Sequence, residues 1–424
     1  MTSGFTVRDG AWSCDGVPLA TIAQAMGTPA YIYSAAAVRE RFHRLSAALA
    51  GYPHAIHYAL KANSTLGLVR LVHGLGASAD ANSVGEIEVA LKAGFRPDQI
   101  VFTGVGKSRG EISRAVSLGL KAINAESRGE LERIDAESLR QGRRTRVALR
   151  VNPDVDARSH PHISTGMKRN KFGVPIGDAR ALLGEMAVRP GLQVVGIHVH
   201  VGSQITTLEP LARAAARMVA LAADLAADGV ALEHLDLGGG LGISYDGGPE
   251  PDVAAYAAIL TEAARKTGLS LIVEPGRWLS GNAGALLAEI IDMKPAPGDE
   301  GAPGRPGRQF VVLDAGMTDL MRPALYGAVH RIVRVDETVT GPAVPCDIVG
   351  PVCESSDAFL GDRTLVDPQV GALVAILDAG AYGSAMGSNY NRRPLAPEVL
   401  VDDGRWRVIR RPQSIDDMVR LECP

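Results

Sequence analysis

Short apolar runs alternate with longer amphipathic stretches along the middle of the chain. Each run is rich in β-branched and aliphatic residues and ends in Gly, Asn, Ser or a charged residue. These runs predict eight strands, at residues 56–60, 77–80, 100–103, 121–124, 146–151, 194–199, 234–237 and 271–273. The stretches between them have helical apolar spacing and predict helices, among them 84–93, 110–118, 128–140 and 208–228. A further helix is predicted at 35–49, with Ser34 as its N-cap.

Strands that alternate with helices indicate βαβ units and a parallel sheet. Eight repeats over about 240 residues match the size of a (β/α)8 TIM barrel. An open doubly wound sheet is the alternative, because its strands are also continuous apolar runs. The count of eight favours the barrel.

The rhythm changes after residue 277. Strands are predicted at 285–293, 309–313, 329–335, 373–377 and 405–409 without helices between them. The Pro- and Gly-rich stretch 295–307 predicts an exposed loop between two of these strands. Residues 5–7 and 30–33 also resemble strands. We therefore predict a barrel domain at 34–278 and a second, mostly β domain, like a β-sandwich or barrel, formed by 1–33 plus 279–424.

Composition excludes several classes of protein. The 44 Lys and Arg residues nearly balance the 47 Asp and Glu residues, so the basic excess typical of a nucleic-acid-binding protein is missing. No run of 18 apolar residues and no N-terminal apolar segment occurs, which predicts a soluble, cytoplasmic protein without a membrane partner. The four cysteines, at 14, 346, 353 and 423, show no C-x-x-C spacing, so neither a disulfide framework nor a Cys-rich zinc site is expected.

Two glycine-containing loops follow the last two predicted barrel strands. Gly238, Gly239 and Gly240 follow the seventh, and Glu274-Pro-Gly276-Arg277 follows the eighth. Phosphate sites in such barrels are often built from these two loops, where backbone N–H groups and a guanidinium can bind an anion. Three consecutive glycines can also be a simple flexible turn. Two anion-suited loops at the expected places favour a phosphorylated ligand.

Lys61 ends the first predicted strand, at the edge where barrel active sites lie. Desolvation there can make an amine nucleophilic toward an aldehyde, although a lone strand-end lysine more often reaches out to solvent. An amine, a phosphate site and a carboxylate together suggest pyridoxal 5'-phosphate held as a Schiff base. Glu274 is the carboxylate that could keep the pyridine nitrogen protonated. The alternative for Glu274 is a rim carboxylate paired with Arg277.

His198 and His200 share one face of the sixth predicted strand. Zinc would need further ligands from other strands, so no metal is predicted. A flat imidazole at His200 could stack on a cofactor ring, and Ser203 could donate to its phosphate. For His198, a hydrogen-bonded core residue is an equal alternative.

The β domain supplies further candidates. Cys353 and Glu354 place a thiol beside a carboxylate, although a buried inert cysteine is the usual case. Arg322 and Tyr326 are four residues apart and could together bind a substrate carboxylate, or be a surface arginine and a half-buried tyrosine. Tyr382 lies between Ala381 and Gly383 and can project freely.

Taken together, these motifs resemble the fold-type III pyridoxal-phosphate decarboxylases, over almost the whole chain from residue 31 to about 421. The resemblance rests on Tyr58-Ala-Leu-Lys-Ala-Asn63, Ile163-Ser-Thr-Gly166, Lys171-Phe-Gly173, His200-Val-Gly-Ser-Gln204, Leu237-Gly-Gly-Gly-Leu-Gly242, Glu274-Pro-Gly-Arg277, Arg322-Pro-Ala-Leu-Tyr326, Gly350-Pro-Val-Cys-Glu-Ser355 and Ala379-Gly-Ala-Tyr382. So many matches in order are far more specific than any single one. Two departures are residues 102–107, where relatives commonly have an Asn-containing loop, and the longer stretch 295–307.

The resemblance implies a role for each candidate residue. Lys61 would carry the cofactor, His200 would stack on its ring and Glu274 would face its pyridine nitrogen. The phosphate region would be held by Ser203, Gly240, Arg277 and Tyr382. Substrate recognition would fall to Arg277, Arg322, Tyr326 and Glu354, with Tyr382 nearby, and Cys353 would reprotonate the product carbon. The family works as a head-to-tail homodimer, so Cys353 and Glu354 would come from the partner subunit.

The closest resemblance is to the branch that decarboxylates meso-2,6-diaminopimelate to L-lysine and CO2, the last step of lysine biosynthesis. Three alternatives remain open. They are a sister decarboxylase acting on ornithine, arginine, carboxynorspermidine or carrier-bound glutamate, a racemase, and a non-catalytic cofactor-binding protein. Arg322, Tyr326 and Glu354 suit a substrate with a distal carboxylate and amine, which favours diaminopimelate.

Overall fold

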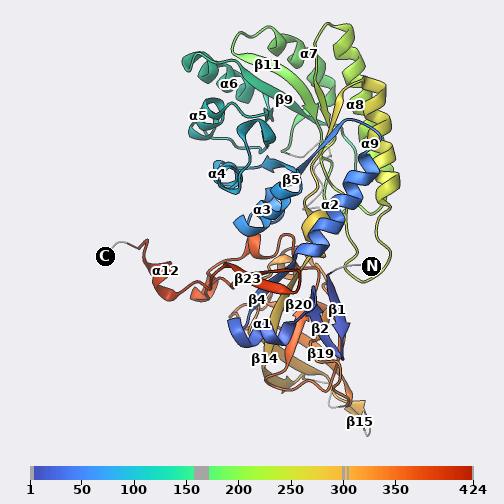
Figure 1. The fold of residues 1–424 in the computed structure, drawn as a ribbon, viewed down its shortest axis with the longest axis vertical. Coiled ribbons are helices and arrows are strands. Elements are labelled where there is room, and N and C mark those ends of the chain that lie inside the picture. Colours follow the sequence, from blue (N-terminus) through green and yellow to red (C-terminus); the bar gives the residue numbers. More distant parts are fainter. Residues whose placement is uncertain (1–3, 157–170, 298–300, 303–304, 423–424) are drawn as a thin grey trace. The chain divides into compact units, whose positions relative to one another are not determined.

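The structure, a computed structural model, describes residues 4–156, 171–297, 301–302 and 305–422 (Figure 1). The chain forms two compact units. The barrel unit comprises residues 41–243 and 250–278, and the β unit comprises residues 1–40, 244–249 and 279–424. Residues 244–249 are thus a six-residue excursion from the barrel unit into the β unit. The chain then returns to the barrel unit, and it enters the β unit for good after Trp278.

The barrel unit is a closed ring of eight parallel strands. They are β5 (His54–Ala59), β6 (Ser78–Ala81), β7 (Ile100–Phe102), β8 (Ala122–Ala125), β9 (Thr145–Asn152), β11 (Leu192–His198), β12 (His234–Asp236) and β13 (Ser270–Val273). Each strand pairs with its neighbours in parallel, and β13 pairs with β5 to close the ring. The predicted TIM barrel is confirmed, and an open doubly wound sheet is excluded. A two-residue strand, β10 (Val174–Pro175), adds to β9.

Helices connect these strands. They are α2 (Ala35–Leu49), α3 (Leu66–Gly74), α4 (Val84–Ala93), α5 (Arg109–Leu118), α6 (Arg128–Arg140), α7 (Ile176–Ala187), α8 (Glu209–Ala227) and α9 (Val253–Thr267), with short turns η1 (Leu60–Ala62), η2 (Pro97–Gln99) and α10 (Arg277–Ser280). Side-chain caps mark where several of them begin, since Ser83, Ser108 and Ser127 accept backbone N–H groups of α4, α5 and α6. The predicted cap of α2 is present, because Ser34 Oγ accepts the N–H of Ala37 at 2.9 Å.

The β unit is built around a mixed sheet in the order β20-β19-β17-β14-β4-β22-β23. Its members are β4 (Ala30–Ser34), β14 (Gly284–Pro295), β17 (Gln309–Leu313), β19 (Ala343–Val349), β20 (Ala358–Val366), β22 (Glu398–Asp402) and β23 (Arg405–Arg410), and β21 (Leu373–Ile376) joins it through β14 while β18 (Ile332–Arg334) pairs with β21. The N-terminal strand β4 lies between β14 and β22. The N-terminal segment therefore completes the C-terminal sheet, as predicted.

The remaining elements of the β unit are small. A three-stranded sheet contains β1 (Phe5–Arg8), β2 (Ala11–Cys14) and β3 (Val17–Pro18), and the helices are α1 (Leu19–Met26), α11 (Arg322–Tyr326) and α12 (Ile415–Val419), with turns η4 (Ser384–Met386) and η5 (Tyr390–Arg392). One buried apolar cluster joins the small sheet, α1 and the large sheet, including Cys14, Leu19, Ile32, Leu287 and Val399.

Residues 295–307 connect β14 to β17, which pair antiparallel through Pro295 and Gln309. Two-residue strands within the connection, β15 (Gly301–Ala302) and β16 (Arg305–Pro306), pair with each other. Residues 298–300 and 303–304 lie outside the described part. Within the described ranges, no helix is long and apolar enough to cross a membrane.

Candidate active site

The C-terminal ends of the barrel strands gather the predicted amine and several acidic side chains. Lys61 follows β5 in the turn η1, and its Nζ lies 3.7 Å from Oδ2 of Asp80, which is on β6. The Lys61 side chain is about one third exposed, whereas Asp80 is fully buried. Burial and the charge of Glu274 raise the pKa of Asp80, and the charge of Lys61 opposes this rise. Lys61 is therefore an accessible amine that lies next to a buried carboxylate.

Glu274 lies in a buried acid–imidazole group. His198, on β11, has its Nε2 3.1 Å from Oε2 of Glu274, just after β13, and both side chains are buried. Burial alone would raise the pKa of Glu274, but the charge and hydrogen bond of His198, with the charge of Lys61, hold this pKa below its usual range. The other oxygen, Oε1, is buried and accepts no hydrogen bond among the described residues. It is an anionic acceptor that requires a donor.

Asp236, at the end of β12, completes this group. Its Oδ1 accepts the N–H of Gly238 at 2.9 Å. Burial and the charge of Glu274 raise the pKa of Asp236 well above its usual range. His198, Asp236 and Glu274 offer ligand atoms within 4.8 Å of one another, which is the spacing of a metal site. The hydrogen bond between His198 and Glu274 explains why these two side chains lie close together, so no metal ion is needed to explain it.

His200 lies beside the glycine turn. The N–H of Gly239 donates to Nδ1 of His200 at 3.2 Å, so this nitrogen carries no proton. As a whole residue, His200 is half-buried. Burial, followed by the charges of Lys61 and Arg150, lowers the pKa of His200 well below its usual range. The side chain is a neutral flat ring, which suits stacking on an aromatic cofactor.

The glycine turn approaches neighbouring backbone too closely for side chains. A Cβ on Gly239 would lie 2.1 Å from the carbonyl oxygen of Glu274, and one on Gly238 would lie 2.4 Å from that of Val199. Gly238 and Gly240 also have φ of +65° and +100°, in the region that favours glycine. The turn runs beside the segment after His200, since Ile205 N–H donates to the Gly240 carbonyl at 2.9 Å.

Ser203 and Arg277 add a hydroxyl and a guanidinium next to this turn. Arg277 Nη2 lies 3.1 Å from Ser203 Oγ, and only about 5% of Arg277 is exposed. A Cβ on Gly276 would touch the methyl groups of Ala59 and Ala62 at 3.2 and 3.0 Å. Backbone N–H groups, a hydroxyl and a buried guanidinium together match the donors that bind phosphate.

These features fit pyridoxal phosphate. Lys61 supplies the amine, the glycine turn and Arg277 suit the phosphate, and Glu274 Oε1 is an acceptor for a protonated ring nitrogen. The alternative of a rim pair between Glu274 and Arg277 is wrong, because Glu274 is buried against His198 and Arg277 contacts Ser203. His198 is a hydrogen-bonded core residue, as one of the two alternatives held.

The other predicted residues belong to the β unit. Arg322 and Tyr326 are the first and last residues of α11, with Arg322 buried and Tyr326 half-buried. Tyr382 has φ of +57°, an uncommon conformation for a residue with a side chain. Cys353 is exposed and outside any disulfide in the described chain, so the inert buried cysteine is excluded; Glu354 beside it is also exposed. The N–H of Cys353 donates to Asn391.

Two motifs of the resemblance remain. Ile163–Gly166 lies outside the described residues. Gly173 donates its N–H to Oε2 of Glu126, whose Oε1 binds Arg150 at 2.7 Å, so residues 171–173 are attached to the ends of β8 and β9. In the loop 102–107, which differs from the loop common in relatives, Lys107 is buried and donates to Glu130 at 2.7 Å.

Sequence analysis did not single out Asp80 and Asp236. The available signal was an acidic residue at the end of a predicted barrel strand, the same position that drew attention to Lys61. Their neighbours in space are far away in sequence, so the contacts with Lys61 and Glu274 had no local signal.

Known proteins resemble this chain over most of its length. Residues 35–281 match the family described as pyridoxal-dependent decarboxylase, pyridoxal binding domain. The chain is 44% identical over 409 residues to the diaminopimelate decarboxylase of Neisseria meningitidis serogroup A, covering 96% of this chain and 98% of that relative.

Solved structures are similar over the same length. The diaminopimelate decarboxylase of Helicobacter pylori complexed with L-lysine has a TM-score of 0.89 and 39% identity, covering 95% of this chain and 98% of that one. The diaminopimelate decarboxylase of M. jannaschii in co-complex with L-lysine has a TM-score of 0.93 and 33% identity, covering 100% of this chain and 99% of that one.

Proposed function

The chain belongs to the diaminopimelate decarboxylases, within the family of pyridoxal-dependent decarboxylases, and we propose how its side chains divide the work of that reaction. The enzyme converts meso-2,6-diaminopimelate to L-lysine and CO2. The bond from one α-carbon to its carboxylate breaks, CO2 leaves, and a proton takes its place. Pyridoxal phosphate, when bound, supplies a conjugated ring that accepts the electron pair of the broken bond.

Lys61 attaches the cofactor through its Nζ. The accessible position of Lys61 at the end of β5 supports this role, as does the buried carboxylate of Asp80, which lies 3.7 Å from Nζ. The accessible Nζ of Lys61 would also be able to exchange with the amines of the substrate and the product.

Glu274 keeps a proton on the ring nitrogen. An ionised carboxylate with a buried oxygen that lacks a donor is suited to this task, because it stabilises positive charge where electron density arrives. His198 holds Glu274 in place through Oε2 and leaves Oε1 for the cofactor. The neutral ring of His200 would pack against the ring of the cofactor.

The phosphate is bound by the glycine turn together with Ser203, Gly276 and Arg277. Donors fixed by the backbone need no reorganisation on binding. Tyr382 adds a contact to the phosphate region, as the resemblance implies.

The distal end of the substrate, which carries an amine and the carboxylate that is retained, is read by Arg277, Arg322, Tyr326 and Glu354, near Tyr382. Arginine suits a carboxylate because it donates two parallel hydrogen bonds. Cys353 donates the proton to the product carbon. The enzyme acts as a head-to-tail homodimer, in which Cys353 and Glu354 serve the active site of the partner subunit. The exposure of both side chains supports this arrangement.

The observation that carries the proposal is the placement of Lys61, Glu274 and the glycine turn at the same end of one barrel, in a chain 44% identical over its length to a diaminopimelate decarboxylase. The test is an assay of the purified, cofactor-loaded protein with diaminopimelate stereoisomers, ornithine and arginine, following lysine and CO2. We expect equimolar lysine and CO2 from the meso isomer. Preferred turnover of ornithine or arginine would contradict the substrate, and racemisation without CO2 would contradict the reaction.

A further inference from the structure

Arg322 is held from two sides within the β unit. Its Nη1 donates to Nε2 of His330 at 2.6 Å, and its guanidinium carbon lies 4.4 Å from the ring centroid of Tyr245. Only about 5% of Arg322 is exposed. A buried guanidinium with one edge bonded and one face covered by an aromatic ring has a fixed plane.

His330 has a defined protonation state. Its Nδ1 lies 2.9 Å from the backbone carbonyl of Leu377, and the ring is buried. A carbonyl only accepts and a guanidinium only donates, so the proton must lie on Nδ1 and Nε2 must be the acceptor. The ring also meets Tyr245 edge-on, with centroids 5.1 Å apart and planes at 76°. Each of Arg322, His330 and Tyr245 therefore contacts the other two.

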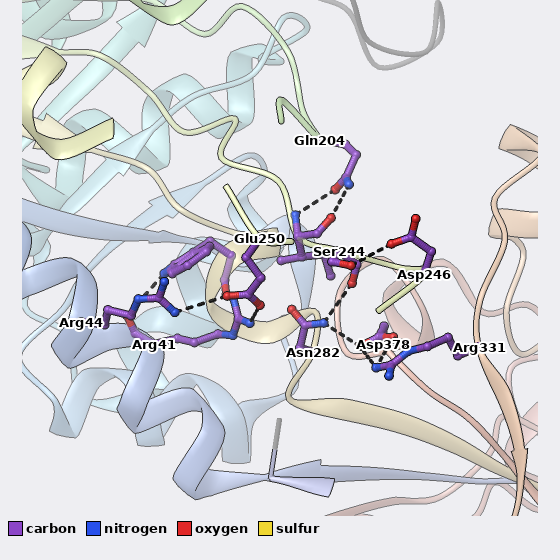
Figure 2. Close-up of polar contacts among 11 residues, drawn as sticks. Arg41, Arg44, Gln204, Ser244, Asp246, Glu250, Asn282, Arg331 and Asp378 are labelled. Atoms are coloured by element: carbon purple, nitrogen blue, oxygen red, sulfur yellow. Dashed lines mark hydrogen bonds and ion pairs between the residues drawn. The ribbon is translucent and has the colours of Figure 1, made fainter. Parts of the chain in front are cut away.

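Tyr245 comes from the six-residue excursion 244–249, which follows the glycine-turn segment of the barrel. Figure 2 shows how the start of this excursion is fixed: Asn282 Nδ2 donates to the Ser244 carbonyl at 3.3 Å and to Asp378 Oδ1 at 2.6 Å, and Arg331 pairs with Asp378 at 2.9 Å. Arg331 and Asp378 directly follow His330 and Leu377 in sequence. One polar network thus fixes both supports of Arg322.

The residues that flank the excursion are fixed within the barrel unit. Gln204 exchanges two hydrogen bonds with the backbone of Ile243, at 2.6 and 3.2 Å. Glu250 binds Arg41 and Arg44 (Figure 2). Both guanidinium groups lie over the ring of the buried Trp278. Within the β unit itself, the hydrogen bond from Asn282 to the Ser244 carbonyl fixes the residue directly before Tyr245.

We propose that Tyr245 and His330 are positioning residues that hold Arg322 ready for the retained carboxylate of the substrate, and so set selectivity for a substrate with a second carboxylate. This inference rests on the proposed function, which assigns Arg322 to the substrate. A mobile arginine would lose side-chain entropy on binding, whereas a fixed one has lost it on folding. Bidentate recognition of a carboxylate also depends on the guanidinium plane, which Tyr245 sets.

The test compares Tyr245→Leu and His330→Leu with the wild-type holoenzyme. We expect each variant to raise KM for diaminopimelate about tenfold, the equivalent of one lost cation–π contact or charged hydrogen bond, with little change in kcat. Tyr245→Phe, which keeps the ring, should recover most of the affinity. Trp406→Leu, another part-buried aromatic of the β unit, is the matched control for general damage and should leave KM unchanged.

The inhibition constants of two compounds distinguish a positioning role from general damage to the fold, because general damage would weaken both inhibitors alike. L-Lysine has the retained carboxylate and cadaverine lacks it, so the variants should weaken inhibition by L-lysine about tenfold and leave that by cadaverine unaltered. Equal weakening of both inhibitors, or no effect on either, would overturn the positioning role. Arg322→Lys separates the two proposals: if this variant binds L-lysine as the wild type does, the assignment of Arg322 to the substrate fails, and the positioning role fails with it. If only the Tyr245 and His330 variants behave as wild type, the positioning role alone fails.

Discussion

Nε2 of His198 lies 3.1 Å from Oε2 of Glu274, with both side chains buried among the ends of the barrel strands. This pair keeps a carboxylate ionised in a place where burial alone would favour its neutral form. The negative charge of Glu274 can then act on a group that hydrogen-bonds to its other oxygen, Oε1, which accepts no hydrogen bond among the described residues.

Glu274→Gln tests that charge. The amide preserves the shape but cannot hold a proton on the ring nitrogen, so kcat should fall by about 10²- to 10³-fold, the range for loss of one preorganised electrostatic contact. Steady-state kinetics at saturating cofactor measure the effect. A kcat within threefold of the wild type would show that the ring nitrogen does not depend on Glu274.

Gly239→Ala tests the close approach of the glycine turn. The new Cβ would lie 2.1 Å from the Glu274 carbonyl oxygen, so the turn must shift and cofactor affinity should fall by about tenfold or more. Fluorescence titration of the cofactor-free protein gives the Kd. Gly177→Ala, in α7 with nothing within 4 Å of its Cβ, is the control and should retain the wild-type Kd. An unchanged Kd for Gly239→Ala would mean that the turn does not shape the cofactor site.

His57, buried on β5, predicts an acid-sensitive barrel. Burial lowers the pKa of His57 to about 4, against 6.5 for the unfolded chain. Between these values the unfolded state binds more protons, so the stability due to neutral His57 is complete above pH 6.5 and is lost progressively as the pH falls toward 4. At pH 5 the loss is about 2 kcal/mol, at ~1.4 kcal/mol per unit over ~1.5 units. Urea unfolding at pH 7.5 and at pH 5 measures how far the free energy of unfolding falls between the two pH values. This fall should be smaller in His57→Leu than in the wild type by that amount. An equal fall in both proteins would contradict the prediction.

Mixing two inactive variants tests the shared active site. Lys61→Ala and Cys353→Ala should each be inactive alone. If Cys353 serves the partner's site, random exchange of subunits gives heterodimers with one intact site, so the mixture should recover about a quarter of the wild-type activity. Light scattering checks that the variants are dimers. A mixture of exchanged dimers that stays inactive would place Lys61 and Cys353 of the same chain in one site.

Local pattern was enough to predict the barrel. Its strands are buried on both faces, so each is a short apolar run, and the eight strands of the ring were all located within two residues; the two-residue strand β10 was not predicted. The β unit was harder. β19 and β20 were missed because their apolar residues are interrupted by Pro345, Gly361 and charged residues, and only pairing with each other and with β17 makes them strands. The excursion of residues 244–249 into the β unit has no local signal, and the predicted boundaries at 33/34 and 278/279 do not include it.

The candidate site divides in the same way. Lys61, Glu274 and the glycine turn were predicted because residue type at a strand end carries chemistry in a barrel. Asp80, Asp236, Tyr245 and His330 were not, because their roles come from contacts between distant segments. Tyr245 and Arg322 are 77 positions apart and meet only in the folded chain.

The central claim is that Nζ of Lys61 attaches the cofactor. Borohydride reduction of the holoenzyme, followed by proteolysis and mass spectrometry, tests it directly. We expect one modified peptide, which carries the reduced cofactor on Lys61, and no modification of the Lys61→Ala variant. Lys266 is an exposed lysine on α9, and the Lys266→Ala variant should be labelled as the wild type is. Modification of Lys107 or another lysine instead, or a cofactor bound without any modified peptide, would contradict the account.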